Sequence, residues 1–166
     1  MTFKDITFAM DLSLNGPGFA VLAVTDGGFP VLLEKSHLKP KGTTHGRKLG
    51  QISEEIDRYL CEYSPDHIVR EKGFSRFAAT TQALYKVVGI ADLYAYMRME
   101  KTIHEIAPTS VKKIVAGNGK ASKDDVQEAV IRRLQIDKPE FFANDDESDA
   151  CAVGVAYFIQ KGLVDA

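Results

Sequence analysis

Four acidic residues stand at positions where an unpaired carboxylate is costly, and two of them end strand-like segments. Asp11 closes the apolar run that begins near Ile6, and Glu71 follows the short segment 67–70 (HIVR). A carboxylate at the end of a central strand is partly desolvated unless a cation pairs with it. Simpler interpretations stay open for each residue alone: Asp11 as a turn-initiating residue, and Glu71 as a solvated residue paired with a neighbouring Arg or Lys.

The other two acids, Asp146 and Asp149, are three residues apart at the start of a predicted helix and therefore share one face. The helix dipole favours acids in a first turn, which accounts for Asp145 and Asp146. It accounts less well for Asp149, because the apolar run 150–154 (ACAVG) follows it directly. Clustered carboxylates are hard oxygen ligands that suit Mg²⁺ or Mn²⁺, so these acids are candidate metal ligands.

The elements that must position these acids follow from hydrophobic spacing and from the turn residues between the segments. The sequence predicts strands at 5–12, 18–24, 30–35, 67–71 and 101–106, and helices at 44–63, 79–99, 109–116, 122–134 and 146–161. This order predicts an α/β fold with a five-stranded mixed sheet, three antiparallel strands followed by two parallel ones, and helices on both faces. The first strand then lies beside the fourth. Four carboxylates brought together in this way can hold two divalent ions about 3.5–4 Å apart.

Length and composition limit the function classes. The chain has 166 residues with 45% hydrophobic and 27% charged residues, which predicts one globular domain over 1–166. We expect no membrane span, because no apolar stretch approaches the about 20 residues that a spanning helix needs. We expect no signal peptide either, because Lys4, Asp5 and Asp11 interrupt the apolar start. The two cysteines, Cys61 and Cys151, form no metal-binding pair, so we expect reduced, buried thiols in a cytoplasmic protein.

Most of the chain resembles the RuvC family of Holliday junction resolvases, within the ribonuclease H-like superfamily. The resemblance lies in segments 8–11 (FAMD), 69–71 (VRE), 111–117 (VKKIVAG) and 146–152 (DESDACA). Where the family has Asp-Pro-Gly, this sequence has Asp11-Leu12-Ser13. In that departure it looks more like the phage-borne members than the cellular ones.

The resemblance implies a catalytic and metal-binding role for four acids, which are Asp11, Glu71, Asp146 and Asp149. It implies two Mg²⁺ per active site, with Mn²⁺ able to substitute, and no small-molecule cofactor. Asp145 stays open as an alternative third ligand, although the spacing to Asp149 favours Asp146. The implied activity is that of a homodimeric endonuclease that makes paired nicks in four-way or other branched DNA, leaving 5′-phosphate and 3′-hydroxyl ends.

The formal charge of −2, from 21 basic and 23 acidic residues, argues at first sight against a nucleic-acid partner. The charge is unevenly distributed, however, because the tracts 35–48, 72–91 and 106–123 carry basic residues and no acid. Such tracts are often only solvated surfaces, but three of them together favour phosphate binding. Within them, Lys112 and Lys123 match lysines that lie near the scissile phosphate in the family.

The segment after Glu71 carries two further candidates for DNA binding, Phe74 and Arg76. Phe74 matches a family aromatic that stacks on an unpaired base, an interaction worth about 1–3 kcal/mol. Phe77 is expected to anchor the loop to the core. The helix at 79–99 is apolar on more than one face, which favours a homodimer interface over simple enclosure in a larger core.

Three other functions share some of these features. A ribonuclease H-type enzyme that cuts RNA–DNA hybrids would use the same carboxylates. A non-catalytic module that binds branched DNA would need only the basic tracts. A nucleotide-binding protein of the actin-like superfamily needs a glycine-rich phosphate loop after the first strand. Segment 15–18 (NGPG) offers glycines there, but Pro17 removes one amide donor.

Overall fold

The computed structural model describes residues 2–73, 75–137 and 142–166. It contains a five-stranded sheet of order β3-β2-β1-β4-β5. The strands β1 (Phe3–Asp11), β2 (Gly18–Thr25) and β3 (Pro30–His37) pair in antiparallel fashion. The strands β4 (His67–Glu71) and β5 (His104–Ile106) add to the β1 edge in parallel. The predicted mixed sheet is therefore confirmed.

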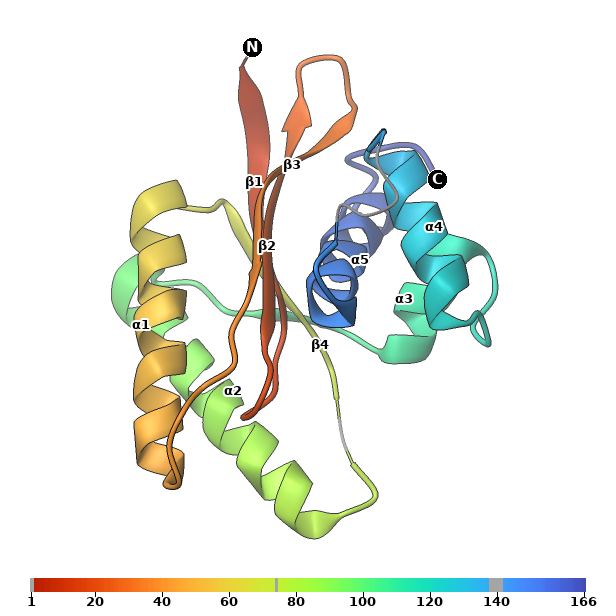
Figure 1. Ribbon diagram of the computed structural model, residues 1–166. Coiled ribbons are helices and arrows are strands. Elements are labelled where there is room, and N and C mark those ends of the chain that lie inside the picture. Colours follow the sequence, from red (N-terminus) through yellow and green to blue (C-terminus); the bar gives the residue numbers. More distant parts are fainter. Residues whose placement is uncertain (1, 74, 138–141) are drawn as a thin grey trace.

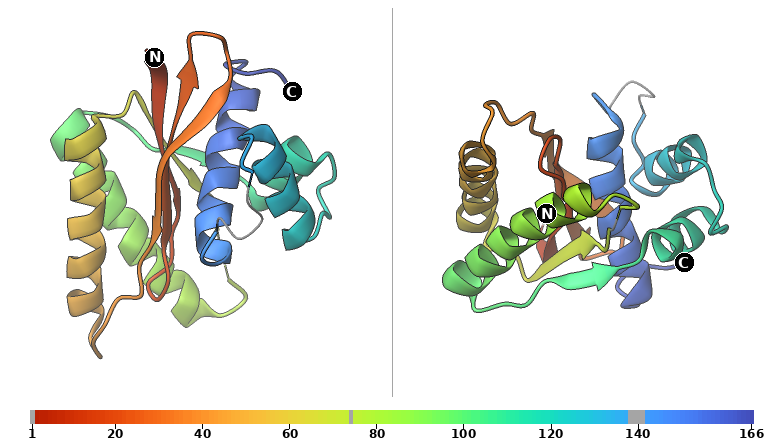
Figure 2. Two further views of the ribbon diagram at one scale, coloured as in Figure 1. Left: turned by 45° about the horizontal axis from the view of Figure 1, so that its top comes forward. Right: turned by 90° about the horizontal axis from the view of Figure 1, so that it is seen from below.

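Helices cover both faces of the sheet, as Figures 1 and 2 show. One face carries α1 (His45–Tyr63) and α2 (Ala78–Met99). The other carries α3 (Pro108–Ala116), α4 (Lys123–Arg133) and α5 (Asp145–Gln160), with α5 lying directly on the strands. Parallel strands require crossover connections, so α1 joins β3 to β4 and α2 joins β4 to β5.

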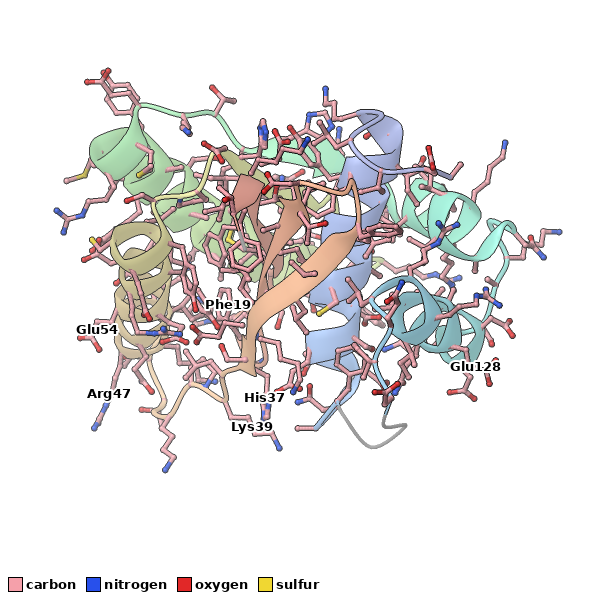
Figure 3. All side chains as sticks on the ribbon, turned by 90° about the horizontal axis from the view of Figure 1, so that it is seen from above. Phe19, His37, Lys39, Arg47, Glu54 and Glu128 are labelled. Carbon is pink, nitrogen blue, oxygen red and sulfur yellow. The ribbon has the colours of Figure 1, made fainter. Side chains whose placement is uncertain are left out.

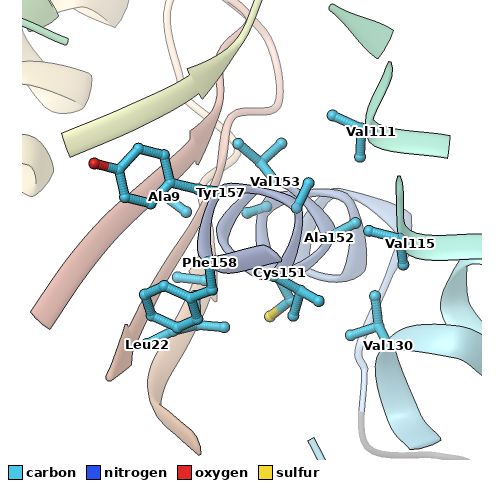
Figure 4. Close-up of a cluster of buried hydrophobic side chains, with 14 of the residues drawn as sticks. Ala9, Leu22, Val111, Val115, Val130, Cys151, Ala152, Val153, Tyr157 and Phe158 are labelled. Atoms are coloured by element: carbon cyan, nitrogen blue, oxygen red, sulfur yellow. The ribbon is translucent and has the colours of Figure 1, made fainter. Parts of the chain in front are cut away.

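The close packing of α5 on the sheet explains why its sequence is small and apolar. Its middle turns are buried among side chains of the strands and of α3 and α4 (Figure 4). A Cβ atom on Gly154 would lie only 2.4 Å from Leu22 Cδ1. Gly154 therefore lets α5 approach β2 more closely than a residue with a side chain would allow.

A second core lies on the α1/α2 side of the sheet. Its centre is aromatic: the ring of Phe8 stacks on Tyr59 at a centroid distance of 4.9 Å and on Phe19 at 6.0 Å. All three rings are fully buried. Alternating residues of β1 supply both cores, with Ala9 on the α5 side and Met10 on the α1/α2 side. This alternation fixes the faces on which Asp11 and Leu12 project.

The helix ends agree with some sequence expectations and correct others. Ser122 and Asp125 form the predicted capping box of α4. Helix α3 begins at Pro108 after Ala107, which makes no side-chain cap, rather than at Thr109. Helix α5 begins one residue earlier than predicted, because Asn144 accepts a hydrogen bond from the Glu147 amide and caps the helix.

Two predicted burials are wrong and one is confirmed. Cys61 is exposed on α1, although Cys151 is buried as expected and both are free thiols. Phe77 is 74% exposed and does not anchor its loop to the core. Phe77 instead occupies the N-cap position of α2, with an extended backbone. The fifth strand covers only 104–106, since residues 101–103 lie outside the parallel ladder with β4.

Within the part of the chain that the structure describes, no helix combines the length and the apolar character needed to cross a membrane.

Candidate active site

Two of the predicted acids lie at the same edge of the sheet, at the ends of adjacent strands. Asp11 is the last residue of β1 and Glu71 is the last residue of β4. The two strands pair in parallel, and their ladder runs up to Met10 opposite Arg70. The next residue on each strand is the acid, so parallel pairing brings the two carboxylates to one edge.

The start of α5 brings the other two acids, Asp146 and Asp149, to this edge. Gly18, which pairs with Asp11 across β1 and β2, makes the approach possible. A Cβ atom on Gly18 would lie only 1.9 Å from the backbone oxygen of Asp146. Any side chain at this position would therefore push the first turn of α5 away from Asp11.

The electrostatics of the site show that its carboxylates repel one another. Burial, reinforced by the charges of Glu71, Asp149 and Asp146, raises the pKa of Asp11 from 3.8 to about 8. Burial and the Asp149 charge raise the pKa of Glu71. Burial also raises the pKa of Asp149, although Lys123 partly opposes this. Acids with raised pKa values in one cluster are typical of functional sites.

Two lysines face this cluster. Lys123 Nζ lies 3.2 Å from Asp145 Oδ2 and 3.5 Å from Asp149 Oδ2. Lys112 and Lys123 line a pocket of about 110 Å³ together with Glu71 and Asp149. Lys123 is the first residue of α4, where the helix dipole is unfavourable for a cation. Its carboxylate partners on α5 explain why a lysine stands there.

Asp145 and Asp146 have different surroundings in the structure. The Asp145 side chain is 60% exposed and pairs with Lys123. The Asp146 charge contributes to the raised pKa of Asp11. Its Oδ2 atom also lies 3.5 Å from the position that a Cβ atom on Gly16 would take, beside the β1–β2 loop. The charges of both acids raise the pKa of Asp149, and that of Asp146 also acts on Asp11, so the choice of Asp146 over Asp145 as third ligand stays a prediction.

The donor set fits divalent cations in chemistry and in charge. It consists of carboxylate oxygens, which hard cations prefer, and its mutual repulsion is the kind that a bound cation relieves. Across residues 2–73, 75–137 and 142–166, no three acidic, histidine or cysteine side chains stand close enough to ligate one ion together. The four carboxylates are thus within electrostatic range of one another but not at ligating distances.

Glu147, between the candidate ligands Asp146 and Asp149, has a different environment that the sequence pattern did not reveal. Its side chain is only 6% exposed and lies 2.5 Å from Lys35 Nζ and 3.0 Å from His37 Nδ1. The amide of Ala143 also donates to it at 2.9 Å. Burial opposes ionisation of Glu147, but these hydrogen bonds outweigh it and lower the pKa below 4.5. We call Glu147, Lys35 and His37 the β3–α5 clamp, because they tie the first turn of α5 to the end of β3.

The clamp changes the interpretation of the first basic tract. Lys35 pairs with Glu147 and does not belong to the outward surface. Figure 3 shows His37 beside the start of α5, whereas Lys39 and Arg47 extend away from the molecule. A basic tract with no acid in its own sequence can therefore still contain a lysine whose partner lies 112 residues away.

The other residues predicted to bind DNA lie in different surroundings, and their role stays a prediction. Phe74 lies outside the described residues. Arg76 is exposed in the loop before α2. Lys112 is half-buried beside Glu71.

Comparison with known proteins agrees with this architecture. The family profile described as crossover junction endodeoxyribonuclease RuvC matches residues 8–157. A protein of that name from Cytophaga hutchinsonii is 30% identical over 168 aligned residues, which cover 98% of this chain and 80% of the relative. Another, from Pseudothermotoga lettingae, is 30% identical and covers 89% of this chain and 90% of the relative.

Solved structures with the same fold include two resolvases. RuvC from Thermus thermophilus, in complex with a Holliday junction substrate, aligns with a TM-score of 0.84 and 20% identity, covering 96% of this chain and 98% of the other. The yeast mitochondrial Holliday junction resolvase Ydc2 aligns with a TM-score of 0.73 and 10% identity, covering 95% and 79%.

Proposed function

The chain belongs to the RuvC family of crossover junction endodeoxyribonucleases, and we propose that it resolves four-way DNA junctions by metal-dependent hydrolysis of the phosphodiester backbone. The observation that carries the proposal is the convergence of Asp11, Glu71, Asp146 and Asp149 in one mutually repelling cluster. The products would be paired nicks with 5′-phosphate and 3′-hydroxyl ends. Other branched DNA would also be a substrate where it presents the same local geometry.

The four acids would hold two divalent ions, Mg²⁺ or the similar Mn²⁺. Such ions lower the pKa of an attacking water and stabilise the leaving oxygen. The chain itself contributes position and charge. Gly18 lets the first turn of α5 approach β1, and the β3–α5 clamp keeps that turn in register with the sheet.

Lys112 and Lys123 would bind the phosphate next to the acids. They line the same pocket as Glu71 and Asp149. Lys123 already bridges Asp145 and Asp149, so neutralisation of these acids by a bound cation would release its charge for a phosphate oxygen. Basic residues on the outer part of the tract after β3, including Lys39 and Arg47, would neutralise phosphates farther along the DNA.

Two symmetric nicks require two active sites, and α2 offers a surface for a homodimer. Four large apolar side chains on this helix are 53–68% exposed: Tyr85, Leu93, Tyr96 and Met97. Tyr85 and Leu93 are eight residues apart, with Gly89 between them, so they share one face of the helix. Exposed aromatic and aliphatic residues in one stripe are typical of an interface.

A substrate panel tests the proposal. Four-way, three-way and linear duplex DNA and an RNA–DNA hybrid are incubated at one salt concentration with Mg²⁺ or Mn²⁺. We expect symmetric nicks in the four-way junction, ends that a ligase reseals, and little cleavage of linear duplex. Preferential cleavage of the hybrid would overturn the proposal in favour of ribonuclease H activity, and binding without cleavage would make the chain a non-catalytic junction-binding protein.

The matched variants separate catalysis from binding. Asp149→Asn removes one candidate ligand, while Asp145→Asn removes a neighbouring carboxylate that is exposed and faces α4. We expect the first variant to bind the junction and not cleave it, and the second to cleave it. Robust cleavage by Asp149→Asn in Mg²⁺ would contradict the assignment of the site.

A further inference from the structure

A buried arginine stands directly before the candidate ligand Glu71 and has no role in the function proposed above. Arg70 is only 3% exposed, although arginine is rarely so buried unless it is paired. Successive residues of a strand project to opposite faces of the sheet, so Arg70 lies on the α1/α2 side and Glu71 on the α5 side. On its own face Arg70 has apolar neighbours, since Met10 and Ile68 belong to the buried core there.

The guanidinium of Arg70 makes two hydrogen bonds that link β5 to the end of β4. Its Nη2 atom donates to Glu105 Oε1 at 2.5 Å, across the ladder in which the two residues are paired. Figure 2 shows β4 and β5 side by side at this edge of the sheet. Its Nη1 atom donates to the backbone oxygen of Glu71 at 3.0 Å. Arg70 therefore binds the main chain of Glu71, and its charge partner is Glu105.

The backbone oxygen of Glu71 lies where the sheet ends. The ladder between β1 and β4 runs up to Met10 opposite Arg70, and Glu71 is the last residue of β4. Just beyond it, the Lys72 amide donates to the Ile106 oxygen at 2.9 Å. The ends of regular elements open more readily than their middles. A side-chain bond at this carbonyl therefore fixes the peptide plane that follows Glu71, and with it the direction in which the carboxylate projects.

This link acts through geometry rather than through charge. Beyond burial, the pKa of Glu71 responds to the charges of three residues on the α5 side, Asp149, Lys112 and Lys123. Arg70 projects to the opposite face of the sheet. A substitution of Arg70 should therefore change the position of the Glu71 carboxylate more than its electrostatic surroundings.

The energetics of Arg70 argue against a purely structural role. Among the described residues, none accepts a hydrogen bond from its buried Nε atom, and a buried donor without an acceptor costs free energy. Glu105 does not depend on Arg70 alone, because it is exposed and lies 3.7 Å from Lys72 Nζ. Replacing a buried ion pair by an apolar residue of similar size is often neutral or stabilising. The fold should therefore tolerate the loss of Arg70.

We propose that Arg70 is a positioning residue for Glu71: its guanidinium ties the Glu71 carbonyl to Glu105 on β5 and so directs the Glu71 carboxylate toward the other acids. The inference rests on the proposed metal-dependent function and adds a residue outside the acid cluster to the machinery of that function. Groups that orient a metal ligand typically change metal affinity or activity by about 10–100-fold when they are removed.

The test compares two substitutions of Arg70 with a matched control. Arg70→Met keeps a long side chain and removes both hydrogen bonds. Arg70→Lys keeps the positive charge but lacks the planar fork that reaches two acceptors at once. The control is Arg133→Met, because Arg133 Nε also donates to a backbone oxygen, that of Val115 at 3.4 Å. Arg133 lies at the opposite end of α4 from Lys123 and therefore away from the acids.

Three measurements separate positioning from stability. Calorimetry should show Mn²⁺ binding about tenfold weaker or more in Arg70→Met. The Mn²⁺ concentration for half-maximal single-turnover nicking should rise by the same factor, and excess Mn²⁺ should restore most of the rate. The urea midpoint in EDTA should stay unchanged or rise. Arg133→Met should match the unsubstituted chain in Mn²⁺ affinity and nicking, and Arg70→Lys should not recover the Mn²⁺ affinity.

Two results would overturn the inference. One is an unchanged Mn²⁺ affinity in Arg70→Met. The other is a lower urea midpoint with a reduced maximal rate and an unchanged half-maximal Mn²⁺ concentration, which is the signature of a structural role. Full recovery of the Mn²⁺ affinity in Arg70→Lys would overturn the need for the fork. The two proposals fail differently, because an unsubstituted chain that binds no Mn²⁺ or never nicks a junction removes the proposed function itself.

Discussion

The first two turns of α5 carry two kinds of carboxylate whose environments are opposite. Glu147 accepts hydrogen bonds from Lys35, His37 and the Ala143 amide, and these lower its pKa. Asp149, two residues farther along, is crowded by burial and by other acids, and its pKa is raised. The two residues are close in sequence, but the helix turns them toward different partners.

The difference separates structural from functional acids. A buried carboxylate that has its donors is a fixed part of the fold, because removing it leaves cations without a partner. In the acid cluster, the nearby lysines do not outweigh burial and mutual repulsion, so the pKa values of Asp11, Glu71 and Asp149 stay raised and the cluster gains by binding a further cation. On this account, the clamp at Glu147 holds the helix so that Asp146 and Asp149 can be left in an unfavourable arrangement with Asp11.

The largest expected effect is on catalysis, where substitution of an acid of the cluster should reduce activity more than substitution of Glu147. Asp11→Asn should reduce junction nicking by about a thousandfold, because loss of a ligand removes several kcal/mol of charge stabilisation. It should leave the melting temperature unchanged or higher, since it removes a repelling charge. Glu147→Gln keeps the shape of the clamp and should lose less activity. A single-turnover nicking assay measures both, and equal losses would contradict the distinction.

The next effect is on stability, where loss of Glu147 should matter more than loss of an acid outside the β3–α5 clamp. Glu147→Ala should lower the free energy of unfolding by about 3–5 kcal/mol, because Lys35 and His37 lose a buried partner. The control is Asp145→Ala, which removes an exposed ion pair with Lys123 and should cost less than about 1 kcal/mol. Urea denaturation measures the two values. Similar losses of unfolding free energy in both variants would contradict a larger contribution of the clamp to stability.

A smaller effect concerns pH. The pKa of Asp11 is about 8 in the folded chain and ordinarily 3.8, so the folded state holds a proton that the unfolded state has released. The free energy of unfolding should therefore fall as pH rises from about 5 to about 8 in EDTA. Melting temperatures across this range measure it. Asp11→Asn should flatten the profile, and an equally steep profile in this variant would contradict the assignment.

The smallest effect is on DNA affinity. The acid cluster repels phosphate, and a divalent cation relieves this repulsion. Junction binding should be about threefold tighter in Ca²⁺ than in EDTA at matched ionic strength. Asp11→Asn should bind well in both conditions. Gel-shift titrations measure the ratio, and equal affinities for the unsubstituted chain in Ca²⁺ and EDTA would contradict the effect.

Much of the fold was accessible from the sequence because local patterns and topology rules agreed. The apolar segments of β1 and β2 with short turns predicted the antiparallel part, and the helices between later strands predicted the parallel part. Placing β1 beside β4 then brought Asp11 and Glu71 to one edge. The acid cluster followed from topology as much as from residue type.

What the sequence did not predict depends on long-range contacts and on side-chain direction. The partner of Glu147 lies on β3, and no local pattern links Lys35 to α5. Cys61 and Phe77 are exposed, because apolar residue type does not decide which way a side chain projects. The need for glycine at position 18 could not be predicted, because it arises from the contact with α5, which is distant in sequence.

The most direct test of the central claim, that the unsatisfied carboxylates form a metal site, is a Mn²⁺ titration followed by calorimetry at pH 8. The account predicts about two ions per chain for the unsubstituted protein and for Asp145→Asn, and fewer for Asp149→Asn. Equal stoichiometry and affinity in the unsubstituted chain and Asp149→Asn would contradict it, as would the absence of binding to the unsubstituted chain.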